Sequence, residues 1–454
     1  MEKVKKQSTK GGFLKGAAWI AAGGFIAKII GALYRIPLTN LIGGYGLGLY
    51  QMVYPVYCLL LTVSATGIPS SIAKLTADRI GRGQSSMPIF KVAMKLFLLI
   101  GIFGSLLMVA IAPALSAAQG SRQVLGGYYA LAPSVFLVSA ISVFRGWFQG
   151  RNHMSPTALS EIAEQVVKVG FGLLFANLFR DNVEKAVVFL LLAVSLSELF
   201  TLFLMLAIFH RVPAPTKLQN TSEKVGVKTV LKMSIPVTLS SIILPLSGLL
   251  DSVLVPRLLS RYAENAVTLY GLFSGGAVTI IGLPVSVCYG IAAASIPSVA
   301  MAHARKDKDK GVSPRKRIGF ALLITVLVAL PSAIGLYLFA EPAAKIIFRS
   351  LTGNELQTLI ALVRTFSISA LTLSCVQTLS ACLTAQGKPQ YAAFSMFLAV
   401  AVKTGVYLFL LRDPQISVFA LAYATNLCYL VAFLLNLMYN LIISKKKRKK
   451  ANGG

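Results

Sequence analysis

Long apolar runs recur along the whole chain, and they restrict its fold more than any other feature. Each run is about 20 residues long, which is the length that a helix needs to cross the hydrocarbon core of a membrane. Apolar residues make up 56% of the chain and charged residues 13%. A soluble chain of 454 residues would form domains whose helices carry polar faces. The sequence therefore predicts an all-α, polytopic membrane protein.

The apolar pattern predicts about twelve transmembrane helices. The eighth and the tenth are long enough to be tilted, or broken at Gly282 or Pro284. The N-terminal run MEKVKKQSTKGG has a basic start but no small-residue cleavage site. We therefore expect the first helix to be retained rather than removed as a signal peptide. To within a few residues, the predicted helices cover 13–34, 47–70, 92–115, 126–147, 157–179, 186–209, 232–253, 267–300, 318–340, 356–384, 390–411 and 416–442.

The net charge of +29 is distributed unevenly between the loops. When the N-terminus is counted as the first loop, the odd loops and the C-terminus hold about 31 of the 44 Lys and Arg residues, and the even loops about 9. Basic loops stay cytoplasmic because Lys and Arg are not readily translocated. The alternation predicts that both termini are cytoplasmic, with the tail SKKKRKK as an anchor near anionic membrane lipids. Nucleic acid is not an expected partner.

Residues that commonly carry catalysis or bind metals form no recognisable motif in this chain. The three histidines lie in loops, and the sequence has neither an HExxH motif nor a Walker loop. We therefore expect no catalytic residues, no metal and no cofactor. The cysteines lie within apolar runs and lack ligand-like spacing, so buried free thiols are expected. They are Cys58, Cys288, Cys375, Cys382 and Cys428.

Three short motifs each occur twice in the chain, and the two copies are separated by nearly the same number of residues in all three cases. Ile-Pro-Ser closes the second and eighth predicted helices, Gln-Gly ends the fourth and tenth, and Lys-x-Gly lies in the fifth and eleventh. Two halves of about six helices each would have the same orientation, related by an axis along the membrane normal. We expect two bundles around a central cavity, in which a substrate would bind. The predicted divisions are an N-terminal bundle at 1–209, a cytoplasmic linker at 210–231, a C-terminal bundle at 232–444 and a basic tail at 445–454.

Charged residues inside the predicted helices are the candidates for a site. Glu161, Glu164 and Lys168 are spaced i, i+3 and i+7, so they share one helix face, and a polar face on a transmembrane helix must point away from lipid. Lys168 lies about 16 Å into its helix, and Lys403 about 20 Å into its own. A lysine near the centre of a membrane costs about 2.5–3.5 kcal/mol on insertion scales. We therefore expect these lysines to face water, a partner or a ligand.

Several of these charges also have a structural interpretation. Lys168 could pair with Glu164 or Glu161 on its own helix, whereas Lys403 has no acid within its own helix. Lys28 could extend toward the outer membrane surface. The residues nearest the outer face could be ordinary interfacial charges. The full set of candidate substrate-binding residues is Lys28, Arg35, Arg145, Glu161, Glu164, Lys168, Glu198, Asp251, Arg364 and Lys403.

The segment FRGWFQGRNHMSPTALSEIAEQVVKVG at 144–170 resembles the fourth-to-fifth-helix motif of the stage V sporulation protein B family. KIIGALYRIPLTNLIGGYGLGLYQMVYP and SATGIPSSIAKLTADRIGRGQ are similar to that family's first loop and second helix. The family belongs to a superfamily of multidrug, oligosaccharidyl-lipid and polysaccharide exporters that includes the lipid II flippase. The resemblance runs over most of the chain and is strongest over 13–170.

The resemblance implies a flippase of the bacterial cytoplasmic membrane. Such a protein moves an undecaprenyl-pyrophosphate-linked saccharide to the outer leaflet by alternating access, for peptidoglycan, polysaccharide or sporulation pathways. Na⁺ or H⁺ could be a coupling ion. Lys28 matches the first basic position of the related lipid II flippase, whereas Tyr34 stands where an arginine is expected and Arg35 follows it. A basic residue expected in the second helix is missing around Thr62, and many relatives have additional helices.

Two other functions fit parts of the sequence. A Na⁺- or H⁺-coupled exporter of organic cations would need acidic and aromatic residues near the membrane centre. Three lysines against one glutamate at that depth favour an anionic substrate. A membrane glycosyltransferase or ligase acting on polyprenyl-linked sugars would need a large outer loop or clustered catalytic acids. The outer loops of this chain are short, so we expect a transporter and not an enzyme.

Overall fold

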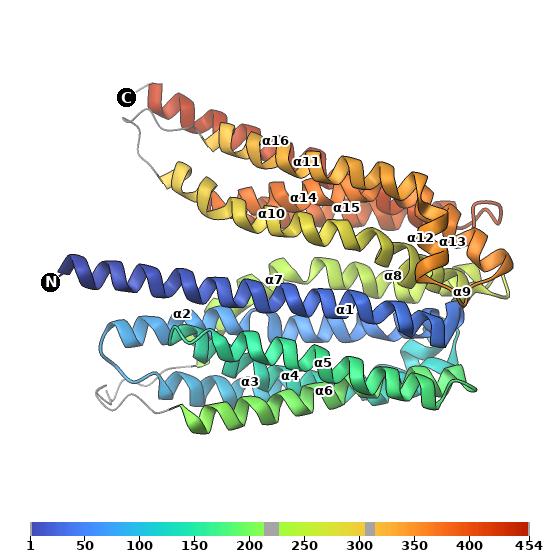
Figure 1. Cartoon of the computed structure of the whole chain (residues 1–454), viewed down its shortest axis with the longest axis horizontal. Coiled ribbons are helices and arrows are strands. Elements are labelled where there is room, and N and C mark those ends of the chain that lie inside the picture. The colour runs from blue at the N-terminus through green and yellow to red at the C-terminus, as the bar shows by residue number, and fades with distance from the viewer. Residues whose placement is uncertain (1, 213–226, 305–313, 453–454) are drawn as a thin grey trace. The chain divides into compact units, whose positions relative to one another are not determined.

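The computed structural model describes residues 2–212, 227–304 and 314–452, and the regular elements in these ranges are helices (Figure 1). This confirms the predicted all-α class. The chain forms two compact units. Unit 1 contains Met1–Ile42 and Met52–Leu249, and unit 2 contains Gly43–Gln51 and Leu250–Gly454.

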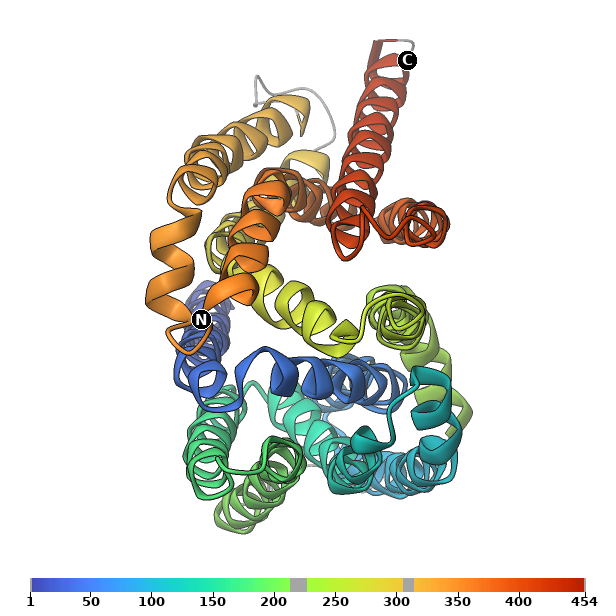
Figure 2. The ribbon, with the colours of Figure 1, turned by 90° about the vertical axis from the view of Figure 1, so that its right-hand side faces the viewer.

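Unit 1 is a helical bundle, seen end-on in blue and green in Figure 2. Within it, α4 packs against α2, α3 and α6, and α5 packs against α6. A π-helical turn at Thr62–Thr66 joins α1 to α2, and a 3₁₀ turn at Arg122–Val124 precedes α4. The helices are α1 (Glu2–Leu61), α2 (Ile68–Gly81), α3 (Met87–Gln119), α4 (Leu125–Gly150), α5 (Ser155–Leu178), α6 (Val183–Arg211) and α7 (Val227–Ser241).

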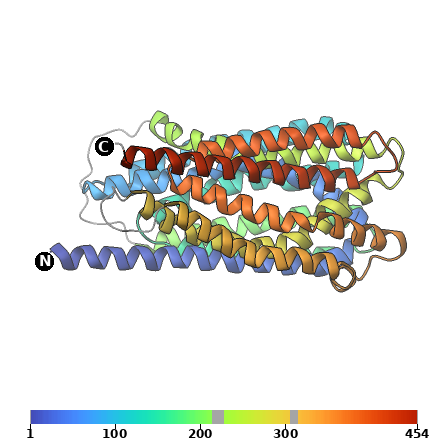
Figure 3. The ribbon, with the colours of Figure 1, turned by 90° about the horizontal axis from the view of Figure 1, so that it is seen from above.

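Unit 2 contains most of α8 and every later helix. Its central helix α14 packs against α10, α11 and α16, and α15 packs against α16. The axes of α11 and α16 are roughly aligned in both side views, with the chain running in opposite directions along them (Figures 1 and 3). The helices are α8 (Ile243–Leu259), α9 (Ala266–Gly271), α10 (Val278–Ala304), α11 (Pro314–Leu338), α12 (Ala340–Ile347), α13 (Gly353–Phe366), α14 (Ile368–Ala385), α15 (Pro389–Leu410) and α16 (Phe419–Asn452).

Each predicted transmembrane helix falls on a helix or a pair of consecutive helices. The first lies in α1, and the second begins in α1 and ends in the first turn of α2. The helical geometry of α1 is interrupted at Gly43 with φ +63°. No atom lies within 4 Å of where a Cβ would stand at Gly43, so the left-handed backbone, rather than space, favours glycine there. In the described part of the chain, nine helical stretches are long and apolar enough to cross a membrane. Helix α5 is not among them, and it is the helix that carries Glu161, Glu164 and Lys168.

The long eighth predicted helix is interrupted earlier than the sequence suggested. Gly282 and Pro284 both lie inside α10, and the interruption is a π-helical turn at Leu272–Ala277. The sequence left two alternatives for this helix, a tilt or a break at Gly282 or Pro284, and the helix is not broken at either residue. Proline can remain inside a transmembrane helix when its neighbours adjust locally. The tenth predicted helix is divided at Ser367, between α13 and α14.

Helix α7 packs within unit 1, although the sequence placed it in the second bundle. A Cβ on Gly67 would lie 2.6 Å from the carbonyl oxygen of Ser234, so this glycine allows α7 to approach the turn before α2. Unit 1 accordingly extends to Leu249. Most of the predicted linker lies outside the described residues, as do the side chains of the basic tail. The predicted domain boundaries stay a prediction.

The segment FRGWFQG fixes the end of α4. A Cβ on Gly146 would lie 2.8 Å from the Pro69 backbone, and one on Gly150 would lie 2.5 Å from the carbonyl of Ala73. These two glycines, one turn apart, let α4 lie directly against α2. The same end of α4 carries Trp147, whose indole N–H donates to Ser86 at 3.1 Å. Arg145 therefore starts from a rigid position.

The ends of α4 and α14 have the same backbone geometry. Asn152 and Gly387 adopt φ +62° and +72°, and in each case the next amide donates to a carbonyl five residues back, from His153 to Phe148 and from Lys388 to Leu383. This is the hydrogen-bond pattern of a left-handed helix C-cap. Lys168 follows Asn152 and Lys403 follows Gly387 at the same distance along the chain. The match supports the predicted repeat.

Candidate functional site

Small residues let α1 approach the helix that carries the charged face. A Cβ on Gly23 of α1 would lie 2.6 Å from the Cβ of Ala158 on α5. Further along the same pair of helices, the Tyr34 hydroxyl fills the space above Gly172. Both contacts lie within unit 1. Helix α5 is thus held against α1 over several turns, and its charged face is enclosed by α1, α4 and α6.

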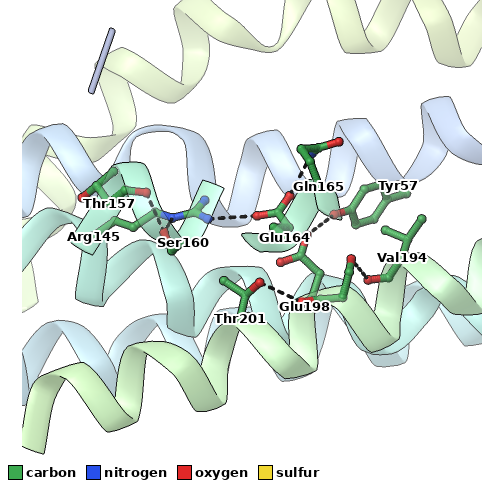
Figure 4. A network of polar contacts seen from close by, with 10 residues as sticks. Tyr57, Arg145, Thr157, Ser160, Glu164, Gln165, Val194, Glu198 and Thr201 are labelled. Carbon is green, nitrogen blue, oxygen red and sulfur yellow. Dashed lines mark hydrogen bonds and ion pairs between the residues drawn. The ribbon is translucent and has the colours of Figure 1, made fainter. Parts of the chain in front are cut away.

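An ion pair crosses from α4 to α5 in the middle of this face. The Arg145 guanidinium lies 2.9 Å from a carboxylate oxygen of Glu164 and also donates to the Ser160 hydroxyl at 2.9 Å (Figure 4). The side chains of Arg145 and Glu164 are 15% and 18% exposed, so the pair is largely screened from solvent. The sequence suggested Glu164 as a partner for Lys168, but Arg145 takes that place.

Glu198 approaches the same point from α6. It is 3% exposed, and one of its oxygens accepts a long hydrogen bond of 3.5 Å from the Tyr57 hydroxyl. Its other oxygen has no hydrogen-bond partner among the described residues. Figure 4 shows the Glu164 and Glu198 side chains pointing to one place, between Arg145 and Tyr57. A buried carboxylate with a single weak hydrogen bond is costly in its ionised form.

Lys168 lies inside this cluster and is half-buried. Glu164, Glu198 and Arg35 are close enough to act on its charge, yet no ion pair with Lys168 is found in the part of the chain that the structure describes. Arg35 is half-buried, as is Glu161, whose carboxylate lies 3.5 Å from the Cβ position of Gly24. The structure therefore brings six of the ten candidate residues together within unit 1.

The positive and negative charges of this cluster are equal in number, whereas the sequence suggested an excess of positive charge. Arg35, Arg145 and Lys168 provide the positive charges. Glu161, Glu164 and Glu198 provide the negative ones. The expectation of three lysines against one glutamate considered only the deepest residues, and it omitted Glu161, Glu164 and the two arginines. We call the group of Arg35, Tyr57, Arg145, Glu161, Glu164, Lys168 and Glu198 the N-terminal charge cluster.

Lys403 in unit 2 has a different environment. Its ammonium group forms an ion pair with Asp251 of α8, and the two side chains are 8% and 14% exposed. Although Lys403 has no acid in its own helix, a neighbouring helix supplies one. The interpretation of Asp251 as an ordinary interfacial charge is therefore wrong. Tyr407 lies one turn further along α15 and also faces Asp251.

The remaining candidates are not brought into either group. Arg364 is exposed near the end of α13, where its charge reaches Glu341 rather than Lys403. Lys28 lies in α1, but its side chain is outside the described residues, so its role stays a prediction. The cysteines are free thiols as expected: Cys58 is half-buried, and the other four are buried.

Sequence reasoning missed three neutral members of this region. The Tyr57 hydroxyl donates a hydrogen bond to Glu198, and the Ser160 hydroxyl accepts one from Arg145. Gln165 donates a hydrogen bond to Glu164 at 3.5 Å. Ser160 and Gln165 are adjacent to the acids that were identified, so the polar face of α5 was itself a usable signal. Tyr57 lies in an apolar run, and only its three-dimensional position identifies it.

The chain resembles several known bacterial proteins over most of its length. It is 25% identical over 425 residues to Stage V sporulation protein B of Bacillus subtilis, covering 91% of this chain and 80% of the relative. It is 22% identical over 451 residues to Lipid II flippase MurJ of the same organism, covering 92% and 81%. These matches agree with the resemblance seen in the sequence.

The fold also matches solved structures. An inward-facing multidrug resistance MATE family transporter of the MOP superfamily superimposes with a TM-score of 0.76 at 18% identity, covering 92% of this chain and 95% of that one. This likeness shows a shared fold, the two-lobed arrangement of twelve helices. The relatives named for an activity are a flippase and a transporter, in agreement with the expectation of a transporter rather than an enzyme. The family model described as polysaccharide biosynthesis protein matches residues 13–303, and the chain therefore belongs to that family.

Proposed function

We propose that this protein is a flippase that moves an undecaprenyl-pyrophosphate-linked saccharide across the bacterial cytoplasmic membrane by alternating access. Membership of the polysaccharide biosynthesis family supports a lipid-linked sugar as the class of substrate, and a relative named as a lipid II flippase supports the same step. Both termini are proposed to be cytoplasmic, because the basic loops alternate.

The observation that carries the proposal is the state of Lys168. It is a half-buried ammonium group inside a membrane protein, with no ion pair among the described residues. A buried charge is normally paired or bound to a ligand. The pyrophosphate of a lipid-linked saccharide carries negative charges that would complete this environment. Arg35, which lies close to Lys168, would add a second donor, and arginine can bind phosphate through two parallel hydrogen bonds.

Lys403 is proposed to have a structural role instead of contacting the headgroup. Asp251 already neutralises it, and both side chains are nearly buried. An anion could bind Lys403 only in competition with that carboxylate. Both lysines were expected to face water, a partner or a ligand. An anion could bind Lys168 without displacing a carboxylate from an ion pair, whereas at Lys403 it could not.

An exporter of organic cations is the second candidate. The buried carboxylate of Glu198 favours it, because one oxygen lacks a hydrogen-bond partner among the described residues and a cation could bind there. The ion pair of Glu164 with Arg145 and the nearby Lys168 weigh against this function. Positive charges so close to Glu198 would repel a cationic substrate.

The test uses purified protein in liposomes that contain a fluorescent undecaprenyl-pyrophosphate saccharide. Leaflet exposure is followed with a membrane-impermeant quencher. Wild type is compared with Lys168→Gln, and with Lys185→Gln as a matched control on the exposed start of α6. A hydrogen bond to a charged group contributes about 1.5–3 kcal/mol, so Lys168→Gln is expected to weaken substrate affinity about ten- to one-hundredfold.

Each result of this experiment has a definite meaning. Flipping by wild type and by Lys185→Gln, with loss in Lys168→Gln, would support both function and contact. Normal flipping by Lys168→Gln would refute the proposed contact but not the function. If wild type does not flip the lipid but takes up an organic cation along a Na⁺ or H⁺ gradient, the exporter is the correct function.

A further inference from the structure

Glu198 differs from the other acids of the N-terminal charge cluster in how poorly it is satisfied. Glu164 accepts a 2.9 Å hydrogen bond from Arg145, and Glu161 is half-buried. Glu198 is 3% exposed, and one of its carboxylate oxygens accepts a 3.5 Å hydrogen bond from Tyr57. Its second oxygen has no partner among the described residues. A buried oxygen of this kind lacks a donor, and a proton is the smallest ligand that could supply one.

The groups that face Glu198 come from each of the neighbouring helices. They are Tyr57 from α1, Arg145 from α4, and Glu164 and Lys168 from α5. With Glu198 ionised, the two carboxylates balance Arg145 and Lys168. With Glu198 protonated, the same group carries one net positive charge. The uncompensated charge then belongs to Lys168, because Arg145 keeps its ion pair with Glu164.

We propose that Glu198 is a proton-binding site that is linked to binding of the anionic headgroup at Lys168. This inference rests on the proposed flippase function, because it requires an anionic substrate. The proton enters as H⁺ from water and adds to the unpartnered carboxylate oxygen, giving a neutral carboxylic acid and breaking no other bond. The anion and the proton then stabilise each other's binding.

The linkage has a fixed sign. Protonation of Glu198 removes a negative charge near Lys168, so an anion binds more tightly as the pH falls. By reciprocity, binding of the anion increases the affinity of Glu198 for its proton. For one linked proton, affinity changes by up to about tenfold per pH unit, over the range where Glu198 titrates. Outside that range the affinity becomes constant.

Calorimetric titration of the full chain in detergent tests this linkage. The probe is a short-chain isoprenyl pyrophosphoryl saccharide, in which both phosphates are esterified and so do not titrate near neutrality. Titrations at one pH in two buffers of different ionisation enthalpy count the protons taken up per ligand. Repeating them over a pH series gives the slope of affinity against pH. The variants are Glu198→Gln and the matched control Glu184→Gln, an exposed acid on the same helix.

Wild type and Glu184→Gln are expected to take up a proton with the ligand and to show the pH slope. Glu198→Gln is expected to bind with no proton uptake and with an affinity that is constant over the pH series. Tyr57→Phe keeps the carboxylate and should keep the slope. Proton uptake that persists in Glu198→Gln, or is absent from wild type that binds the ligand, would overturn the inference while leaving the flippase function intact. Failure of wild type to bind the ligand at any pH would instead refute the proposed function, and the inference with it.

Discussion

The ion pair of Lys403 with Asp251 allows the sharpest test of the difference between the two units. The side chains are 8% and 14% exposed, so removal of either one leaves a charge buried without its main partner. Breaking a buried ion pair in this way typically costs about 3–5 kcal/mol, whereas replacing both partners with neutral residues is often close to neutral. We expect Lys403→Met and Asp251→Asn each to destabilise the protein by about that amount. The double variant should regain most of the loss, with a coupling energy of at least about 2 kcal/mol.

The free energy of unfolding can be followed by circular dichroism in mixed micelles of a mild detergent and dodecyl sulfate. The pair of Lys345 and Glu341 is a matched control, because it joins the same kinds of group across one helical turn but is 56% and 46% exposed. Lys345→Met is expected to leave the free energy of unfolding almost unchanged, because solvent-exposed ion pairs contribute little. The same double variant at Lys403 and Asp251, reconstituted in liposomes, should also retain flipping.

Two results would refute this reasoning. If the Lys403 and Asp251 double variant is as unstable as the sum of its single variants, the two side chains do not stabilise each other. If the double variant is stable but no longer flips the lipid, Lys403 contacts the substrate, as the sequence alone suggested. The measurement of stability tests the ion pair, and the flipping assay tests the role of Lys403 in transport.

Two further predictions concern the parts outside the charged groups. Gly43→Ala should destabilise the protein by about 1–3 kcal/mol, because the backbone there has φ +63° and ψ −172°, a conformation essentially restricted to glycine. Gly81→Ala, in open space without a positive φ, is the control, and equal unfolding curves for the two variants would contradict the prediction. Lys345 holds the pKa of the Glu341 carboxyl below its usual range through a hydrogen bond, so the contribution of this pair to stability is present above that range and is lost as the pH falls through the lowered pKa. In Lys345→Met the pKa of Glu341 should return toward its usual range, and a carboxyl titration by NMR that shows no change would contradict this.

Apolar periodicity was sufficient to predict the helices, because each transmembrane helix satisfies its own backbone hydrogen bonds and carries its own apolar length. The shared face of Glu161, Glu164 and Lys168 was likewise predictable, since it depends only on spacing along one helix. Which groups pair was not predictable. Arg145 reaches Glu164 from another helix, and Lys403 reaches Asp251 across 152 positions of the chain. Such contacts depend on how the helices pack. Glycines such as Gly146 allow two helices to come close together, and the spacing of residues along one helix does not show which helices do so.

The two lysines show how a repeated sequence can acquire different surroundings. Lys168 and Lys403 stand at the same distance beyond equivalent helix ends, so the repeat gives each unit a cation at a similar depth. In unit 2 an acid from α8 neutralises that cation. In unit 1 the nearest acids are Glu164, which is held by Arg145, and Glu198, which a proton can neutralise. A transporter must change its affinity for the anion during the transport cycle. A cation can provide this change if the negative charge of the neighbouring acid can be removed. Glu198 can serve as such an acid for Lys168 because it forms no ion pair within the described part of the chain, whereas Asp251 is held in an ion pair with Lys403. This is why the N-terminal charge cluster is the better candidate for the substrate site.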